Sequence, residues 1–242
     1  MEIDVTITAT CRAKILDTTL NSFFKNLLCG FNCKGIINID VIGPDTVVDI
    51  IKILETYFKK LEINISHNPS FGEAFKWCWS MVERSWVFHL EDDWLLNRPV
   101  YLDHLKSILD SEPNLALLRL PQFLSGQFYM KNWNKFFPWN GLYYKCPEEL
   151  KGGLGFCGHP SLIKSQFVEN VRKYINPNLN PEKQFHAKSG PLMDEVLKWE
   201  YGVYGYPGMD AFITDLGRKW MIKNGYAKEG NKAYFMKWKK TA

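Results

Sequence analysis

What the sequence lacks excludes several classes of protein. No apolar run approaches the ~18–20 residues that cross a bilayer as a helix. The first residues, Met-Glu-Ile-Asp-Val-Thr-Ile-Thr, are acidic and alternating, unlike the cationic start of a secretory signal peptide. The six cysteines are not arranged in the close pairs typical of a zinc site, and a chain of 242 residues can build its core without disulfides. We therefore expect a cytoplasmic protein with free thiols.

Charge of either sign is also modest. Lys and Arg number 30 and Asp and Glu 26, so the net charge is +4, weaker than that of a dedicated nucleic-acid-binding module. Hydrophobic residues make up 46% and charged residues 23%, as in ordinary globular domains, so a disordered chain is excluded. The sequence contains no repeat, low-complexity tract or clear linker. We therefore expect a single domain over residues 1–242.

Strands and helices are predicted to alternate in the first ninety residues. Apolar patterning predicts strands at 3–9, 36–42, 61–66 and 86–90, and helices at 14–28, 46–60 and 71–82. Beyond them we expect a helix at 99–110, a strand at 115–120, helices at 161–174 and 192–200, and a strand at 203–206. This order is typical of βαβ units, so the predicted fold class is α/β with a mostly parallel sheet flanked by helices.

Three adjacent carboxylates, Glu91, Asp92 and Asp93, directly follow the predicted strand at 86–90. In parallel sheets, ligands bind where the strands end, so these acids are expected to lie at a site. Ionised carboxylates this close repel one another unless a cation or hydrogen-bond donors compensate. Mg²⁺ or Mn²⁺ compensates such a cluster and also binds phosphate oxygens. The alternative is a solvated helix start, where the helix dipole favours acids.

Several short motifs, taken in order, resemble those of nucleotide-sugar-dependent glycosyltransferases with the GT-A fold. Thr10-Cys11-Arg12 resembles the nucleotide-binding turn after the first strand, and Gly43-Pro44-Asp45 resembles the segment that cups the nucleobase. Asn68-Pro69-Ser70-Phe71-Gly72 resembles an Asn-x-Gly-type loop, and Glu91-Asp92-Asp93 resembles the Asp-x-Asp motif. The resemblance covers nearly the whole chain and implies a Rossmann-like, mostly parallel mixed sheet in one domain.

The resemblance also implies roles for these residues. Asp93 takes the last acidic place, which binds the divalent metal, Mn²⁺ or Mg²⁺. Glu91 and Asp92 take the places that contact the ribose or a water on the metal. Glu91 stands where the family has Asp, and it is a candidate both for nucleotide binding and for metal binding. The nucleotide, for which UDP is favoured, is expected to contact Thr10, Arg12, Gly43, Asp45, Asn68, Gly72, Glu91, Asp92 and Arg218.

Three later segments complete the expected site. The glycine-dense run Gly152–His159 resembles the part that borders the donor sugar and the acceptor. Asp194 and Glu195, at the start of a short helix, stand where the family has the general base that takes the acceptor's proton. Asp215 is a candidate metal ligand, and Arg218 or Lys219 is expected to reach the diphosphate. An inverting reaction is favoured.

Alternatives to a glycosyltransferase stay open at this point. One is a non-catalytic sugar- or nucleic-acid-binding protein on the same fold, and another is a nucleotidyltransferase. The sequence does not identify the acceptor, and a hydroxylated base in DNA is one candidate because Lys237, Lys239 and Lys240 flank Trp238 in a basic tail. A terminal helix packed on the domain is the other interpretation of that tail. We expect 1–98 to form the nucleotide-binding half and 99–242 the acceptor half.

Overall fold

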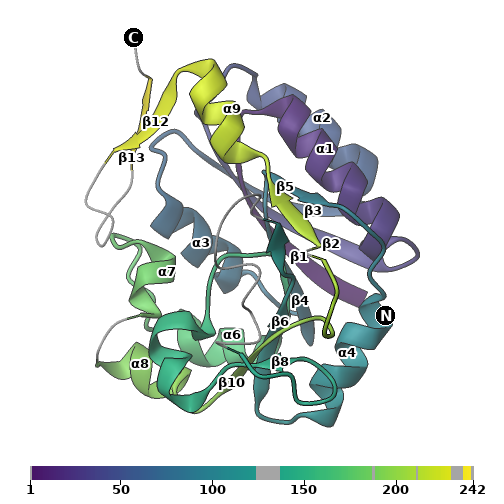
Figure 1. The fold of residues 1–242 in the computed structure, drawn as a ribbon. Coiled ribbons are helices and arrows are strands. Elements are labelled where there is room, and N and C mark those ends of the chain that lie inside the picture. The colour runs from purple at the N-terminus through teal and green to yellow at the C-terminus, as the bar shows by residue number, and fades with distance from the viewer. Residues whose placement is uncertain (1, 124–136, 187–188, 211, 230–236, 241–242) are drawn as a thin grey trace.

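An eight-stranded mixed sheet runs through the centre of the structure (Figure 1). The structure is a computed structural model, and it describes residues 2–123, 137–186, 189–210, 212–229 and 237–240. Parallel pairing joins the first four strands of the chain, and antiparallel pairing enters with β9 and β8. The strand order is β3 (Lys60–Ser66), β2 (Asn32–Asp40), β1 (Glu2–Thr10), β4 (Trp86–Glu91), β9 (Ser161–Lys164), β6 (Leu115–Arg119), β10 (Glu200–Val203) and β8 (Tyr144–Lys145).

Helices cover both faces of this sheet, so the molecule has three layers in one α/β domain. One face packs against α1 (Ala13–Phe23), the π-helical turn η1 (Phe24–Leu28), α2 (Val47–Tyr57) and α4 (Leu102–Ser111). The other face packs against α3 (Phe71–Ser80), α6 (Ser165–Arg172) and α8 (Pro191–Val196), and α7 (Pro181–Gln184) lies beside α3. The remaining helical segments are η3 (Glu148–Leu150), η4 (Lys151–Gly155) and α9 (Gly217–Asn224).

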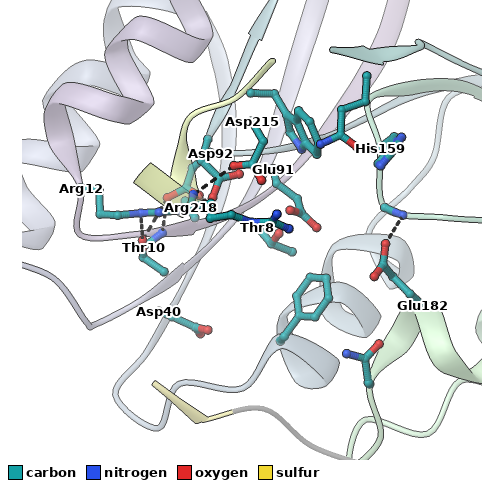
Figure 2. A pocket seen from close by; sticks show the side chains of 17 residues that line it. Thr8, Thr10, Arg12, Asp40, Glu91, Asp92, His159, Glu182, Asp215 and Arg218 are labelled. Atoms are coloured by element: carbon teal, nitrogen blue, oxygen red, sulfur yellow. Dashed lines mark hydrogen bonds and ion pairs between the residues drawn. The ribbon is translucent and has the colours of Figure 1, made fainter. Parts of the chain in front are cut away.

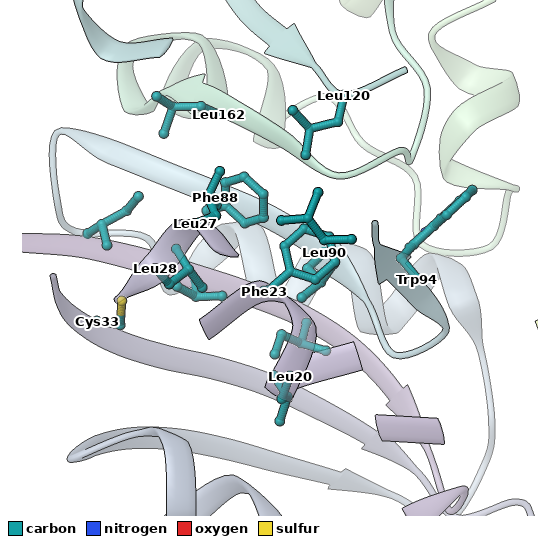
Figure 3. Close-up of a cluster of buried hydrophobic side chains, with 14 of the residues drawn as sticks. Leu20, Phe23, Leu27, Leu28, Cys33, Phe88, Leu90, Trp94, Leu120 and Leu162 are labelled. Carbon is teal, nitrogen blue, oxygen red and sulfur yellow. The ribbon is translucent and has the colours of Figure 1, made fainter. Parts of the chain in front are cut away.

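The side-chain alternation of β1 decides which residues fill each layer. Ile3, Val5 and Ile7 are fully buried in the first core, because successive side chains of a strand point to opposite faces. Figure 3 shows part of this core, where Phe23 from α1 meets Phe88 and Leu90 from β4. The opposite face of β1 carries polar residues, which need partners when they are buried. This face therefore presents threonine side chains to the second layer, where β1 ends.

The strand order reverses between β1 and β4, and this reversal positions the site. The chain passes from β1 to β2 and β3 on one side, then returns to pair β4 with the other side of β1. At such a switch point the connections leave in opposite directions, which opens a crevice at the carboxyl ends of the two strands. Arg12 follows the end of β1, and the three acids stand at the end of β4.

A second, three-stranded sheet lies beside that crevice. Its strands are β5 (Trp94–Leu96), β11 (Ile213–Asp215) and β7 (Gln122–Phe123), in that order. Asp215 pairs with Trp94 in antiparallel register, which joins residues more than a hundred positions apart in the sequence. The C-terminal part of the described chain then forms a hairpin of β12 (Tyr226–Glu229) and β13 (Lys237–Lys240).

The predicted fold class is confirmed, with some corrections to individual elements. The helix expected at 161–174 is in fact a strand followed by a helix, because Ser161–Lys164 pairs with both β4 and β6 as β9. The expected strand at 203–206 lies earlier, at Glu200–Val203. The interpretation of the tail as a terminal helix is wrong, since Lys237–Lys240 is a strand. No helix within the described ranges is long and apolar enough to cross a membrane.

Candidate active site

A polar pocket occupies the crevice at the switch point (Figure 2). Residues from both predicted halves of the chain line it, although the division at residue 98 itself stays a prediction. Its walls come from the ends of β1, β2 and β4, from the second sheet, and from the segments before β9 and at the start of α7. The lining residues are Thr8, Ala9, Thr10, Arg12, Asp40, Phe71, Glu91, Asp92, Asp93, Trp94, Gln122, Gly158, His159, Asn180, Glu182, Asp215 and Arg218.

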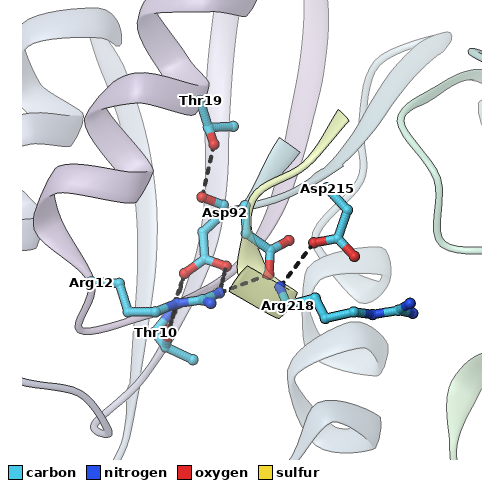
Figure 4. Close-up of polar contacts among 7 residues, drawn as sticks. Thr10, Arg12, Thr19, Asp92, Asp215 and Arg218 are labelled. Atoms are coloured by element: carbon cyan, nitrogen blue, oxygen red, sulfur yellow. Dashed lines mark hydrogen bonds and ion pairs between the residues drawn. The ribbon is translucent and has the colours of Figure 1, made fainter. Parts of the chain in front are cut away.

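Arg12 holds the acidic cluster in place (Figure 4). Its Nη2 lies 2.5 Å from Oδ1 of Asp92 and 3.0 Å from Oδ2 of Asp93. The other oxygen of Asp92 accepts hydrogen bonds from the backbone N–H (2.8 Å) and the hydroxyl (3.0 Å) of Thr10. Burial alone would lower the pKa of Arg12, but the two carboxylates outweigh it and raise the pKa, so the guanidinium stays charged. Asp92 is thus an anchor that joins the ends of β1 and β4.

Asp93 and Asp215 stand side by side because of the second sheet. The backbone N–H of Leu216 donates to the carbonyl of Asp93 at 2.8 Å, which extends the pairing of β11 with β5. Gly217 follows, and a Cβ built there would lie 1.9 Å from Oδ2 of Asp93, so only glycine fits. The N–H of Arg218 donates to Oδ1 of Asp215 at 3.1 Å, and its exposed side chain lines the pocket. A guanidinium in this place suits a phosphate.

Two further carboxylates flank Gly158 on the opposite wall. A Cβ built on Gly158 would lie 2.9 Å from Oε1 of Glu91 and 3.1 Å from Oε1 of Glu182. Glu182 accepts the backbone N–H of Gly158 at 2.7 Å, and its second oxygen has no hydrogen-bond partner within the described part of the chain. Pro181 opens α7 and Asn180 caps it by accepting the N–H of Lys183 at 3.1 Å. This short capped helix carries Glu182 to the pocket.

Asp40 closes the end of the pocket where β2 stops. It is only 6% exposed, and its Oδ1 accepts a hydrogen bond from Asn38 at 2.9 Å. Burial raises the pKa of Asp40 to about 6, and the bond from Asn38 opposes part of that rise. Phe71, the first residue of α3, lines the same pocket. A pocket lined by both a carboxylate and an aromatic ring suits a flat heterocycle that has an N–H to donate.

The carboxylates suit a hard divalent cation. Within the described residues no three His, Cys, Asp or Glu side chains form a preformed metal cage. Mg²⁺ and similar ions need no such cage, since they usually take one or two carboxylates and complete their shell with water and phosphate oxygens. Asp93 and Asp215, with Glu91 across the pocket, supply oxygen ligands of this kind. The residues present therefore fit a Mg²⁺- or Mn²⁺-dependent site.

The pocket brings together seven of the residues predicted from the sequence. These are Thr10, Arg12, Glu91, Asp92, Asp93, Asp215 and Arg218. Gly43 lies beside them, in a small crevice lined by Thr10, Arg12, Ile42, Trp220 and Tyr226. Its φ is +136°, and a Cβ there would come within 2.1 Å of the carbonyl oxygen of Cys11, so the turn needs glycine.

The other predicted residues are not among those that line the pocket. Asp45 accepts the N–H of Ala13 at 2.7 Å and so caps the start of α1. Asn68 accepts the Ser66 hydroxyl through its backbone carbonyl, and Gly72 lets α3 approach the carbonyl oxygens of Pro177 and Leu179. Asp194 is exposed on α8, and Glu195 is paired with Lys198 at 2.6 Å.

Sequence reasoning missed several residues that line the pocket, above all Asp40 and Glu182. Asp40 could have been predicted, because it lies near the end of the strand expected at 36–42, three residues before Gly43. Glu182 also had a local signal, since Asn180-Pro181-Glu182 is an N-cap followed by a proline at the first helical position. Gly158 and His159, which also line the pocket, end the glycine-dense run that the resemblance placed near the donor sugar and the acceptor.

The fold is similar to that of known proteins. The structure is similar to that of Staphylococcus aureus TarS in complex with UDP, with a TM-score of 0.59 and 12% identity over 88% of this chain. It is also similar to the mannosyltransferase PcManGT from Pyrobaculum calidifontis in complex with GDP-Man and Mn²⁺, with a TM-score of 0.56 and 11% identity over 88% of this chain. The chain has a GT-A glycosyltransferase fold. This confirms the fold that the sequence motifs implied.

The GT-A similarity extends to part of these proteins only. The chain spans 60% of the TarS fragment with UDP, 56% of PcManGT and 36% of a longer TarS structure. No protein-family model and no curated protein matches the sequence. At 11–12% identity the similarity establishes the fold.

Proposed function

We propose that this protein is a metal-dependent glycosyltransferase that moves a sugar from a nucleotide-sugar donor, with a UDP-sugar favoured, to an acceptor hydroxyl. One observation carries the proposal: Asp93, Asp215 and Arg218 converge at the β1–β4 switch point, where Arg12 fixes the acidic cluster. This is the group of residues that a leaving diphosphate requires, because negative charge develops on it as the bond to the sugar breaks. TarS and PcManGT have been solved with such ligands on the same fold.

The diphosphate is expected to lie between the acids and Arg218. Asp93 and Asp215, helped by Glu91, would hold Mg²⁺ or Mn²⁺, which supplies Lewis-acid stabilisation of the diphosphate when bound. Arg218 contributes a second, permanent positive charge from the start of α9. Arg12 has a different role: it is buried and engaged by Asp92 and Asp93, so it keeps the acids in position. Thr10 shares that role through its two hydrogen bonds to Asp92.

The nucleobase is placed at the Asp40 end of the pocket. Asp40 can accept an N–H from a base, and uracil offers one at its N3 position. Guanine also offers N–H donors on one edge, so the choice between UDP and GDP is decided by the donor assay described below. Phe71 provides an aromatic ring in the lining of the same pocket. Gly43 lies in the neighbouring crevice, where the absence of a Cβ lets its turn pack against the carbonyl oxygen of Cys11.

Glu182 is our candidate for the general base, in place of Asp194 and Glu195. It lines the pocket, and its bond to the N–H of Gly158 fixes the direction of the carboxylate while leaving one oxygen to take a proton. Asp194 and Glu195 lie on α8, outside the residues that line the pocket. A base must come within hydrogen-bond reach of the acceptor hydroxyl, so residues outside the pocket do not meet the first requirement. A carboxylate base of this kind suits an inverting reaction.

The wall around Gly158 also bears on the acceptor. Glu91 and Glu182 are both acidic and His159 stands next to them, so this side of the pocket favours a neutral hydroxyl compound over a phosphate-rich one. We therefore place a polyol or sugar first among acceptors. A hydroxylated base in DNA remains the second candidate, since the net charge is +4 and the β12–β13 hairpin carries a Lys-rich segment. Within that segment, residues 234–236 and the side chains of 237–240 lie outside what the structure describes.

A donor assay tests the proposal directly. The purified protein is incubated with a panel of UDP- and GDP-sugars, with Mn²⁺ or with EDTA, and the released nucleotide is identified. Metal-dependent release of a nucleoside diphosphate supports a glycosyltransferase, whereas release of pyrophosphate would indicate a nucleotidyltransferase. Binding of the donor without any turnover, with or without polyol acceptors, would favour the non-catalytic sugar-binding alternative.

A further inference from the structure

Cys157 lies in an unusual electrostatic environment beside the pocket. It immediately precedes Gly158 and His159, which line the pocket, and it is itself partly exposed. Arg119, at the end of β6, donates from Nη1 to the sulfur of Cys157 at 3.2 Å. Arg119 is only 5% exposed, and its guanidinium also lies over the ring of Phe137 at 5.0 Å. A cation is therefore held against this sulfur by the packing of the core.

His159 is a second basic residue close to Cys157. Burial by itself raises the pKa of Cys157, but the charges of His159 and Arg119 outweigh it and lower the pKa to about 6. The carboxylate of Glu182 opposes this effect without cancelling it. The pKa of His159 is raised in turn by the sulfur, although burial works against the rise. Arg119, in hydrogen-bond contact with the sulfur, and the neighbouring His159 therefore both favour the thiolate form of Cys157, and such an environment makes a cysteine nucleophilic.

The other cysteines differ from Cys157 in this respect. Burial raises the pKa of Cys33 and Cys78 to about 12 and that of Cys146 to about 11, which leaves their thiols protonated and unreactive. Burial also raises the pKa of Cys11. Cys29 is exposed and serves as a natural internal reference. All six cysteines are free, so each can be probed in the unmodified protein.

We propose that Cys157 is a covalent-modification site, a nucleophilic thiolate held by Arg119 and His159 that reacts with soft electrophiles and with hydrogen peroxide. With peroxide, the sulfur attacks one oxygen, an S–O bond forms, the O–O bond breaks, and hydroxide leaves and is protonated to water. The product is a sulfenic acid, and the sulfur is oxidised by two electrons while the peroxide is reduced by two. The oxidation removes the negative charge from the sulfur that faces Arg119. Gly158 and His159, which line the pocket, are next to this sulfur in the chain. This inference does not depend on the identity of the sugar donor or of the acceptor.

Alkylation of the native chain tests the nucleophile. The full-length protein, free of ligands, is treated briefly with iodoacetamide between pH 5 and 9, quenched, and mapped by peptide mass spectrometry. We expect Cys157 to be the first site labelled, and we expect its labelling rate to reach half of its maximum near pH 6. At pH 6 its rate should exceed that of an ordinary thiol in a peptide by about 10-fold, because the larger thiolate fraction outweighs the lower nucleophilicity of a low-pKa sulfur.

Matched variants distinguish the intrinsic reactivity of Cys157 from labelling that depends only on solvent exposure. Cys157→Ser should abolish the low-pH labelling, and Cys29→Ser should leave it unchanged. Arg119→Gln should raise the midpoint and slow the labelling; if that variant does not fold, His159→Gln provides the same test from the other cation. A midpoint near 8.5 in the native chain, or labelling of Cys157 only after unfolding in urea, would overturn the proposal.

Oxidation is read out separately. After treatment with hydrogen peroxide, dimedone should trap a sulfenic acid at Cys157, and Cys157→Ser should show no adduct at any other position at the same dose. Low-pH alkylation without a dimedone adduct would remove the peroxide step and keep the nucleophilic thiolate. Loss of both would remove the modification site altogether.

Discussion

The Nη2 atom of Arg12 lies 2.5 Å from Oδ1 of Asp92, and both side chains are almost entirely buried. This pair links the turn after β1 to the end of β4, the two strands between which the sheet order reverses. The same nitrogen also reaches Asp93, so the buried Arg12–Asp92 pair helps to position the proposed metal-binding carboxylate. Buried contacts therefore fix the geometry of the site.

Breaking this pair should destabilise the fold strongly. Arg12→Gln leaves Asp92 buried without its cation, and removing one partner of a buried ion pair typically costs about 3–5 kcal/mol. Urea unfolding followed by circular dichroism measures the change. Arg98→Gln is the matched control, because Arg98 pairs with Asp210 at the surface and its loss should cost less than about 1 kcal/mol. Equal effects of the two substitutions would contradict the anchoring role of Arg12.

Asp93→Ala should abolish metal-dependent nucleotide binding and leave the fold intact. The side chain of Asp93 contacts Arg12, but Asp92 and Thr10 retain their own bonds, so the core of the network survives. Titration calorimetry with UDP, with and without Mn²⁺, gives the affinity, and thermal unfolding checks the fold. Asn68→Ala is a control, since Asn68 does not line the pocket. Mn²⁺-dependent binding that survives in Asp93→Ala would show that other residues hold the metal.

Substitution of the candidate base should separate chemistry from binding. Glu182→Gln keeps the shape of the side chain but removes proton acceptance, so we expect transfer to fall by roughly 10²–10⁴-fold with little change in donor affinity. Asp194→Asn and Glu195→Gln should keep near-native turnover, because neither residue lines the pocket. The kcat and donor affinity of the three variants are compared with one acceptor. The reverse pattern, with loss only in Asp194→Asn or Glu195→Gln, would return the base to α8.

Asp40 predicts a defined pH dependence of stability. Burial raises the pKa of Asp40 in the folded protein to about 6, above its ordinary value of about 4, so the folded state binds this proton more tightly than the unfolded state. The contribution of Asp40 to stability is present below about pH 4 and is lost as the pH rises through about 6. As the pH rises from 4 to 6.5, wild type should therefore lose stability relative to Asp40→Asn. Urea unfolding at several pH values measures the difference, and parallel curves for the two proteins would show that Asp40 titrates normally.

The DNA alternative is testable through salt. If the Lys-rich segment contacts DNA, each lost phosphate contact should flatten the log–log dependence of binding on salt by about 0.7–0.9. The measurement compares wild type with a combined Lys237→Ala, Lys239→Ala and Lys240→Ala variant on single- and double-stranded DNA. Equal slopes would exclude this segment as a DNA contact. Undetectable binding by wild type at low salt would remove DNA from the candidate acceptors and leave the polyol or sugar proposal.

Much of the fold could be predicted from the sequence because its signals are local. The alternation of Ile3, Val5 and Ile7 with polar residues marks β1, and the helical stripe that includes Leu16 and Leu20 marks α1. Prediction failed at Ser161–Lys164, where a short segment next to a helix pairs with β4 and β6. Four residues are too few to show a period, so only the strands on either side make this segment a strand.

The sequence by itself determined the acidic cluster and its place at the end of a strand, since both depend on neighbours in the chain. Only the tertiary structure decided which distant residues join it. Asp215 reaches Asp93 through the pairing of β11 with β5, and Glu182 reaches Gly158 across a capped helix start. The same packing leaves Asp194 exposed on α8 and uses Asp45 as a helix cap. Local patterns fix the type of each element, but a site is made by long-range contacts, whose partners no local pattern specifies.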